Sequence, residues 1–198
     1  MPTSIILAVE DDLSETVLRV ILEQSNKKYD VVACYGRRGR EYLRKMMNAF
    51  NSASRNFPHL VLTDLDSVDC PMMLINEWLP YPKNSKLIFR IAVREVEAWV
   101  MADRRAFADF LGIKVHLVPE QLDQVEDPKK LLFELTRKSR NRELKESILP
   151  LSGGISKVGP DYNGQLGFFV KEFWRVNLAI GHSLSLERAN RAILNFIY

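Results

Sequence analysis

The chain has 198 residues, 46% hydrophobic and 27% charged, which suits one large globular domain or one domain with an appended subdomain. A net charge of +3 is too small to indicate nucleic-acid binding by itself. The two cysteines lie far apart without a CxxC motif, so no disulfide framework is indicated and a reduced, cytoplasmic setting is expected. No membrane association is expected, because no apolar run is long enough for a membrane span and the N-terminus lacks the basic start of a signal peptide.

The first predicted strand, Ile5–Val9, is an apolar run that stops at Glu10, Asp11 and Asp12. An apolar run without alternation is typical of a strand buried on both faces of a parallel sheet. In open α/β sheets ligands bind beyond the carboxyl ends of the strands, so we expect Glu10 at the functional rim. An amphipathic helix is predicted to begin near Asp12, where Asp12 and Glu15 have the spacing of a capping box.

Two further strands are predicted at Tyr29–Tyr35 and Leu60–Thr63, separated by a basic turn and a helix over Glu41–Phe50. The later strand delivers Asp64 and Asp66, which project to the same side if the chain is extended there. Two carboxylates so close repel each other unless a cation or a proton lies between them. Oxygen ligands alone favour Mg²⁺ or Mn²⁺. The alternative is that both aspartates are turn and cap residues.

The fourth predicted strand is Ser85–Val93, and Arg90 interrupts its apolar run. We expect the Arg90 guanidinium to neutralise the acids at the strand ends. A helix is predicted over Arg94–Leu111, with Glu95 and Glu97 at its start. Acids in a first turn are favoured by the helix dipole, and the same two residues are also candidates for metal ligation or substrate positioning.

After residue 112 the composition becomes more polar and more basic. Asp127 followed by Pro128 predicts a helix start, and Lys129 and Lys130 open the densest basic stretch of the chain. Such a stretch is either a solvated surface or a phosphate-contact surface. Lys157 lies in a glycine-rich loop that lacks the order of a P-loop. Two closing helices are predicted, at Gln165–Trp174 and Ser185–Tyr198.

The segments ILAVEDD, VVACYGRRGREYL and PHLVLTDLD together resemble a response-regulator receiver domain. This resemblance implies that Asp64 is phosphorylated and that Asp11 and Asp12 hold Mg²⁺. The chain departs from the receiver pattern beyond Asp66. It has no small Ser/Thr-Ala step after the fourth strand and no Lys-Pro after a fifth strand, so the phosphoryl group would lack its usual partners.

A second resemblance covers nearly the whole chain. Glu10 and the Asp64-Leu65-Asp66 motif resemble the acidic residues of TOPRIM domains. The segments AVEDDLSETVLRVIL, FRIAVREVEAWVMADR, EDPKKLL and VGPDYN…SLSLERA resemble a bacterial family that is regarded as TOPRIM-like and is often encoded beside ATPases in phage-defence loci. The resemblance implies a metal-dependent nuclease or defence effector related to the overcoming-lysogenization-defect nucleases. Asp11 stands where the TOPRIM pattern usually has glycine.

We predict an α/β fold: a TOPRIM-like, Rossmann-like sheet of about four mostly parallel strands flanked by helices over residues 1–112, with a helical extension over 113–198 packed on it. The predicted function is Mg²⁺- or Mn²⁺-dependent cleavage of nucleic-acid phosphodiesters, in anti-phage defence with an ATPase partner; a homo-oligomer is compatible with this organisation. The alternatives are a receiver-like phospho-acceptor domain and a non-catalytic interaction subunit of an ATPase complex. The predicted site residues are Glu10, Asp64 and Asp66 for metal, Glu10, Glu95 and Glu97 for catalysis, and Arg94, Lys129, Lys130 and Lys157 for phosphate contact.

Overall fold

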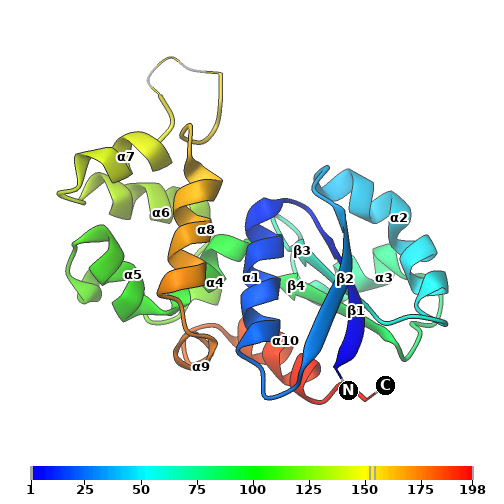
Figure 1. The fold of residues 1–198 in the computed structure, drawn as a ribbon. Coiled ribbons are helices and arrows are strands. Elements are labelled where there is room, and N and C mark those ends of the chain that lie inside the picture. Colours follow the sequence, from blue (N-terminus) through cyan, green and yellow to red (C-terminus); the bar gives the residue numbers. More distant parts are fainter. Residues whose placement is uncertain (1, 152, 154, 198) are drawn as a thin grey trace. The chain divides into compact units, whose positions relative to one another are not determined.

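The computed structural model describes residues 2–151, 153 and 155–197 of the chain (Figure 1). Positions 152 and 154 of the predicted glycine-rich loop, and Tyr198 at the end of the predicted closing helix, lie outside the described residues. The chain divides into two compact units: a sheet unit, made of residues up to 93 and from 185 onward, and a helical unit, made of residues 94–184. The predicted domain boundary after residue 112 falls inside the helical unit, just after helix α5 (Arg104–Leu111).

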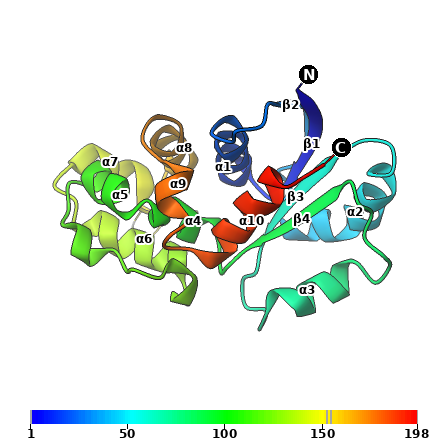
Figure 2. The same ribbon diagram turned by 90° about the horizontal axis from the view of Figure 1, so that it is seen from below.

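The sheet unit has four parallel strands in the order β2-β1-β3-β4. Its elements are β1 (Thr3–Val9), α1 (Asp12–Glu23), β2 (Tyr29–Gly36), α2 (Arg40–Ala53), β3 (His59–Asp64), α3 (Pro71–Trp78), β4 (Leu87–Ala92) and α10 (Leu184–Leu194). Helices α1 and α10 lie on one face of the sheet, and α2 and α3 lie on the other (Figure 2). The predicted α/β fold class, with a parallel sheet flanked by helices and a helical C-terminal part, is confirmed.

Burial on both faces explains why the apolar runs form strands. In β3 every residue from His59 to Thr63 is buried, and Asp64 is the first to reach solvent. On the α2/α3 face, Trp78 stacks on Phe89 with ring centroids 5.9 Å apart, within a core that also takes side chains from α2. Each fully buried large apolar side chain contributes about 1.5–3 kcal/mol, so the polar ends of the strands are held at the edge of this core.

The cap of α1 differs from the prediction by one residue. Asp11, not Asp12, is the N-cap, and its carboxylate accepts a hydrogen bond from the Ser14 amide at 2.8 Å. Glu15 therefore closes no capping box. Instead it forms ion pairs with Arg19 at 2.8 Å and Arg37 at 3.4 Å.

The helical unit corrects the single helix that was predicted over residues 94–111. The chain breaks at Asp103, which ends α4 (Val96–Ala102) and caps α5 by accepting from the Ala106 amide at 3.3 Å. Its second oxygen accepts from the Arg175 amide at 3.0 Å. Backbone amides thus satisfy the buried Asp103 carboxylate. Its capping role starts a new helix at a point where the hydrophobic periodicity alone indicated that the first helix continues. The remaining elements are η1 (Val115–Leu117), η2 (Leu122–Gln124), α6 (Pro128–Arg137), α7 (Arg142–Ile148), α8 (Tyr162–Glu172) and α9 (Val176–Ala179).

Aromatic side chains form much of the helical unit's core. The Trp174 indole donates to the Trp99 carbonyl at 3.0 Å, and Phe107 meets Phe169 edge to face at 5.4 Å. The predicted start of α6 is confirmed, because Asp127 accepts from the Lys130 amide at 2.8 Å ahead of a proline at the first helical position. None of the helices in the described part of the chain has the length and apolar character that a membrane crossing requires.

Candidate functional site

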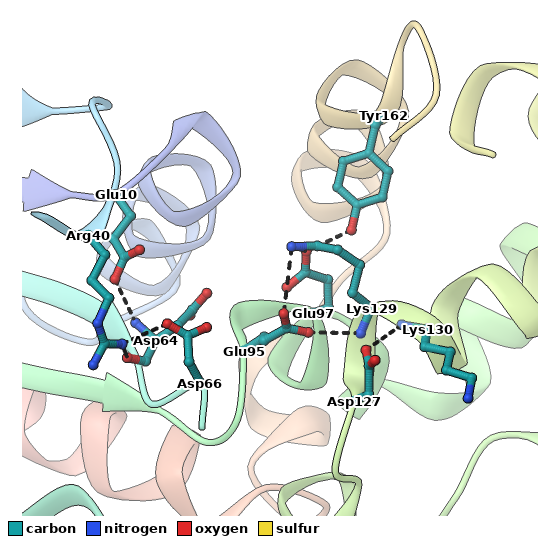
Figure 3. A network of polar contacts seen from close by, with 10 residues as sticks. All are labelled: Glu10, Arg40, Asp64, Asp66, Glu95, Glu97, Asp127, Lys129, Lys130 and Tyr162. Atoms are coloured by element: carbon teal, nitrogen blue, oxygen red, sulfur yellow. Dashed lines mark hydrogen bonds and ion pairs between the residues drawn. The ribbon is translucent and has the colours of Figure 1, made fainter. Parts of the chain in front are cut away.

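The ends of β1 and β3 bring Glu10 against Asp64 in the sheet unit (Figure 3). These strands are neighbours in register, with Ala8 opposite Val61. One Glu10 carboxylate oxygen accepts a hydrogen bond from the Asp64 amide at 3.1 Å and another from the Thr63 hydroxyl. The predicted meeting of the first and third strand ends is therefore observed.

The loop after β2 fixes the backbone of this edge. The Arg37 amide donates to the Val9 carbonyl at 2.9 Å, and the Gly39 amide donates to the Glu10 carbonyl at 3.0 Å. Gly36 has φ +100°, and a Cβ added there would lie 2.0 Å from the Val9 oxygen, so only glycine fits this close approach. As a consequence α2 begins, at Arg40, beside the acids of β3.

Arg40 is the cation of this edge. Its guanidinium donates to the Asp64 carbonyl at 2.8 Å and to the Asp66 carboxylate at 2.7 Å (Figure 3). It also lies over the Trp78 ring, 5.4 Å from the ring centroid. Asp66 has φ +50°, a left-handed conformation that aspartate tolerates better than most residues. The sequence prediction gave the neutralising role to Arg90, which makes no ion pair with these acids in the described chain.

The Glu10 carboxyl has a raised pKa. Burial is the largest cause, and the negative charge of Asp66 adds to it. The hydrogen bonds from Thr63 and the Asp64 amide, together with Arg40, act in the opposite direction. The pKa of Glu10 is thus decided by burial, which raises it, and by the hydrogen-bond donors and Arg40, which lower it.

The donors of this edge suit a hard divalent cation. Glu10, Asp64 and Asp66 offer carboxylate oxygens, which are the ligands of Mg²⁺ and Mn²⁺. The Arg40 guanidinium already shows that positive charge is favoured between the Asp64 carbonyl and the Asp66 carboxylate. Within the described residues, no three side chains of His, Cys, Asp or Glu converge as a ready-made metal-binding group. The metal role of these acids therefore stays a prediction.

A second polar cluster lies in the helical unit and centres on Glu97 (Figure 3). The Glu97 side chain is only 2% exposed. One of its oxygens accepts from the Tyr162 hydroxyl at 2.7 Å and forms an ion pair with Lys129 at 3.1 Å. The other oxygen is buried without a hydrogen-bond partner among the described residues. A buried carboxylate that is satisfied on one side only is costly to maintain, and it is a recognised mark of functional sites.

Glu95 completes this cluster from the N-cap position of α4. It makes no side-chain cap to its own helix, and it accepts from the Lys129 amide at the start of α6 at 2.9 Å. Its other oxygen lies 3.7 Å from the Lys129 ammonium. Burial raises the pKa of Glu95, the charge of Glu97 raises it further, and Lys129 lowers it. Two carboxylates therefore share one ammonium group.

The four predicted phosphate contacts have different surroundings. Lys129 is engaged with Glu95 and Glu97, whereas the side chains of Lys130 and Lys157 are exposed. Arg94 is half-buried. Sequence reasoning missed three contributors to the two clusters: Arg40, Thr63 and Tyr162. The placement of an arginine at a helix start, where the dipole disfavours a cation, was the available signal for Arg40.

The fold and the site together define an α/β protein whose carboxylates gather at the carboxyl edge of a parallel sheet. One solved structure that is similar to this chain is the C-terminal region of the Burkholderia pseudomallei OLD protein, at 16% sequence identity and a TM-score of 0.38. The similarity covers 96% of this chain and 98% of that one. A TM-score of this size is too low to carry any role across. No protein-family model matches the chain, and no curated protein matches it.

Proposed function

We propose that this protein hydrolyses phosphodiester bonds of nucleic acid with the help of Mg²⁺ or Mn²⁺. The observation that supports it most directly is the position of Glu10, whose carboxylate lies against the Asp64 amide where two neighbouring parallel strands end. Ligand sites in open α/β sheets occur at this edge. The sequence resemblance to TOPRIM domains, which rests on Glu10, Asp64 and Asp66, agrees with the proposal.

The proposed roles follow from the chemistry of each side chain. Asp64 and Asp66 hold the cation, and Glu10 is either a third ligand or the general acid/base. A bound divalent cation would neutralise the phosphate and lower the pKa of a coordinated water. Burial raises the pKa of Glu10, so this residue can exchange a proton closer to neutral pH than an exposed glutamate does.

Arg40 has a specific place in this scheme. The Arg40 guanidinium donates a hydrogen bond to the Asp66 carboxylate. Arg40 therefore competes with a divalent cation for this carboxylate, and it holds the carboxylate in place when no divalent cation is bound. Glu95 and Glu97 are the candidates for a second cation, with the Lys129 ammonium balancing their charge. Arg94, Lys129, Lys130 and Lys157 are the proposed contacts to phosphate.

The test is a cleavage assay on plasmid DNA and on RNA with Mg²⁺, with Mn²⁺ and with a chelator. Asp64→Asn should abolish cleavage, because it removes the charge that holds the cation. Asp69→Asn is the matched control, since Asp69 is an exposed aspartate in the loop that follows β3 and its substitution makes the same change in net charge. Mg²⁺ binding measured by calorimetry should disappear in the first variant and persist in the second. Equal cleavage by both variants would contradict the proposal.

A receiver-like role for Asp64 has one observation in its favour. The strand order β2-β1-β3-β4 is the order in which flavodoxin-like sheets, including those of receivers, begin. The described part of the chain contains no fifth strand after β4, so the lysine that a receiver places there has no counterpart. Phosphorylation of Asp64 by acetyl phosphate would favour this alternative.

The ATPase partner and the defence role rest on the family resemblance alone. We propose that the protein works with an ATPase encoded beside it, and co-purification with that gene product tests this. A protein that co-purifies with the ATPase and neither cleaves nucleic acid nor accepts phosphate would be a non-catalytic interaction subunit.

A further inference from the structure

The outer side of β2 has no strand beside it, because β2 is the first strand in the order of the sheet. The Arg37 amide faces β1, where it donates to the Val9 carbonyl at 2.9 Å. Alternate residues of a strand direct their backbone groups to opposite sides, so the groups of Tyr35 also face β1 and those of Cys34 face outward. Among the described residues, no segment other than β1 forms a backbone–backbone hydrogen bond with β2. The outward N–H and C=O groups can therefore accept another strand.

β2 lacks most of the features that protect an exposed strand from such pairing. It is eight residues long, contains no proline or lysine, and has Asp30 as its one charged residue. Two of its apolar side chains, Val32 and Tyr35, are 50% and 48% exposed. Its one protective feature is an irregular register, in which Val32 has no partner on β1. Edge strands of natural proteins are usually short, charged or covered, so an open strand of this length indicates an interaction surface.

An apolar pocket of about 390 Å³ lies beside this strand, between the sheet and α2. Its sheet side is formed by Tyr35 of β2, Ile6 of β1 and His59 of β3. The pocket has room because α2 presents the small side chains of Ala49 and Ala53 to it, and both of these residues are exposed. Tyr35 thus belongs to the open strand and to the pocket, so a segment paired with β2 could place a large apolar side chain there.

The charges around this surface indicate the chemistry of its partner. No acidic or basic residue lines the pocket, and burial lowers the pKa of His59, so its imidazole is neutral at pH 7. Lys28 precedes β2 and Arg38 follows it; both are exposed, and neither has an ion pair among the described residues. The Arg38 guanidinium lies 5.4 Å from the centroid of the Tyr42 ring, which lines the pocket. An apolar side chain flanked by acidic residues complements this arrangement.

We propose that β2 binds an extended, acidic segment of a partner protein, which pairs with the outer side of the strand and inserts a large apolar side chain into the pocket beside Tyr35. In this mode of recognition, backbone pairing supplies affinity and the pocket supplies specificity. A second copy of the chain is a poorer partner, because antiparallel pairing of β2 with itself brings Lys28 of one copy toward Arg37 and Arg38 of the other. The inference goes beyond the proposed nuclease activity and does not depend on it.

The first experiment selects binders to the full chain from a library of random twelve-residue peptides and measures their affinities by fluorescence polarisation. The enriched peptides should carry a large apolar residue flanked by Asp or Glu. Cys34→Pro should weaken their binding about tenfold or more, because it removes an outward N–H and obstructs pairing, and proline is tolerated on the free side of an edge strand. Cys34→Val is the matched control, since it keeps the N–H and should bind as the wild type does.

Ala49→Trp tests the pocket and serves if the Cys34→Pro variant does not fold. The indole should fill the pocket and weaken binding by at least about tenfold, because the inserted side chain loses its burial. Asn48→Trp is the matched control, since Asn48 is an exposed residue of α2 outside the pocket lining. The proposal is wrong if no peptide is enriched, or if the enriched peptides bind the Cys34→Pro and Ala49→Trp variants as tightly as the wild type.

Two measurements test the identity of the partner. Affinity for the peptides should fall as salt rises, and it should fall less steeply in Arg38→Gln; an affinity independent of salt would contradict the acidic character of the segment. Size-exclusion chromatography should show no dimer that depends on β2. A wild-type dimer that Cys34→Pro converts to a monomer would mean that a second copy occupies the strand, and it would overturn the assignment to a partner protein.

Discussion

Removing the hydrogen bond from Thr63 to Glu10 should lower the free energy of unfolding by an amount that depends on pH. Thr63 is 1% exposed, and Thr63→Val keeps its shape while removing the hydroxyl that Glu10 accepts from. Hydrogen bonds to a charged acceptor contribute about 1.5–3 kcal/mol, and those between neutral groups about 0.5–1.5 kcal/mol. We therefore expect the free energy of unfolding to fall by about 1.5–3 kcal/mol at pH values where Glu10 is ionised, and by about 0.5–1.5 kcal/mol where it is protonated.

The sign of the pH dependence follows from the raised pKa of Glu10. A carboxyl whose pKa is raised by folding favours the folded state at low pH, and this contribution is lost as pH rises through the folded-state pKa. Thr63→Val removes one of the donors that lower that pKa, so it raises the pKa further. The variant should lose more stability above the folded-state pKa of Glu10 than below the ordinary pKa of glutamate.

Urea unfolding at neutral and at acidic pH measures this difference. Thr136→Val is the control, because the buried Thr136 hydroxyl donates to the uncharged Leu132 carbonyl at 2.8 Å. The cost of that substitution should be the same at both pH values. An equal loss for Thr63→Val at both pH values would refute the interpretation that the Glu10 carboxyl accepts this hydrogen bond more strongly when it is ionised.

Three further predictions concern other parts of the chain. Gly36→Ala should lower the free energy of unfolding by roughly 3 kcal/mol, or the melting temperature by about 6–12 °C, because it combines backbone strain with a Cβ clash at 2.0 Å. Gly39→Ala, at φ +77° in open space, should cost only about 1 kcal/mol. Similar losses for the two variants would contradict this prediction. Lys129→Gln should lower the free energy of unfolding by about 1–3 kcal/mol by removing the cation beside buried Glu97, and adding Glu97→Gln should recover part of it in a double-mutant cycle; additive losses would argue against the pair. Burial and the charge of Glu15 raise the pKa of the Cys34 thiol to about 12, so its alkylation, followed by mass spectrometry, should keep accelerating far into alkaline pH; a plateau near the ordinary thiol pKa would show the raised value to be wrong.

The strands and their polar ends could be predicted from the sequence because the signal is local. An apolar run such as that before Glu10 can be buried on two faces only inside a parallel sheet, and the first charged residue marks where burial stops. The cap of α6 at Asp127 is local in the same sense, since one side chain and the next few amides decide it. The break at Asp103 could not be predicted in this way, because one of the amides that satisfy it belongs to Arg175, far along the chain.

The sequence by itself determined that Glu10, Asp64 and Asp66 stand at strand ends, because hydrophobic periodicity and the cost of burying a carboxylate act residue by residue. Only the tertiary structure decided which cation meets them. The alternation along β4 turns Arg90 to the other face of the sheet, while amides of the loop after β2 bind the end of β1 and place Arg40 beside Asp66. Pairing between charges depends on positions in space that contacts distant in the sequence establish, and no local pattern encodes them.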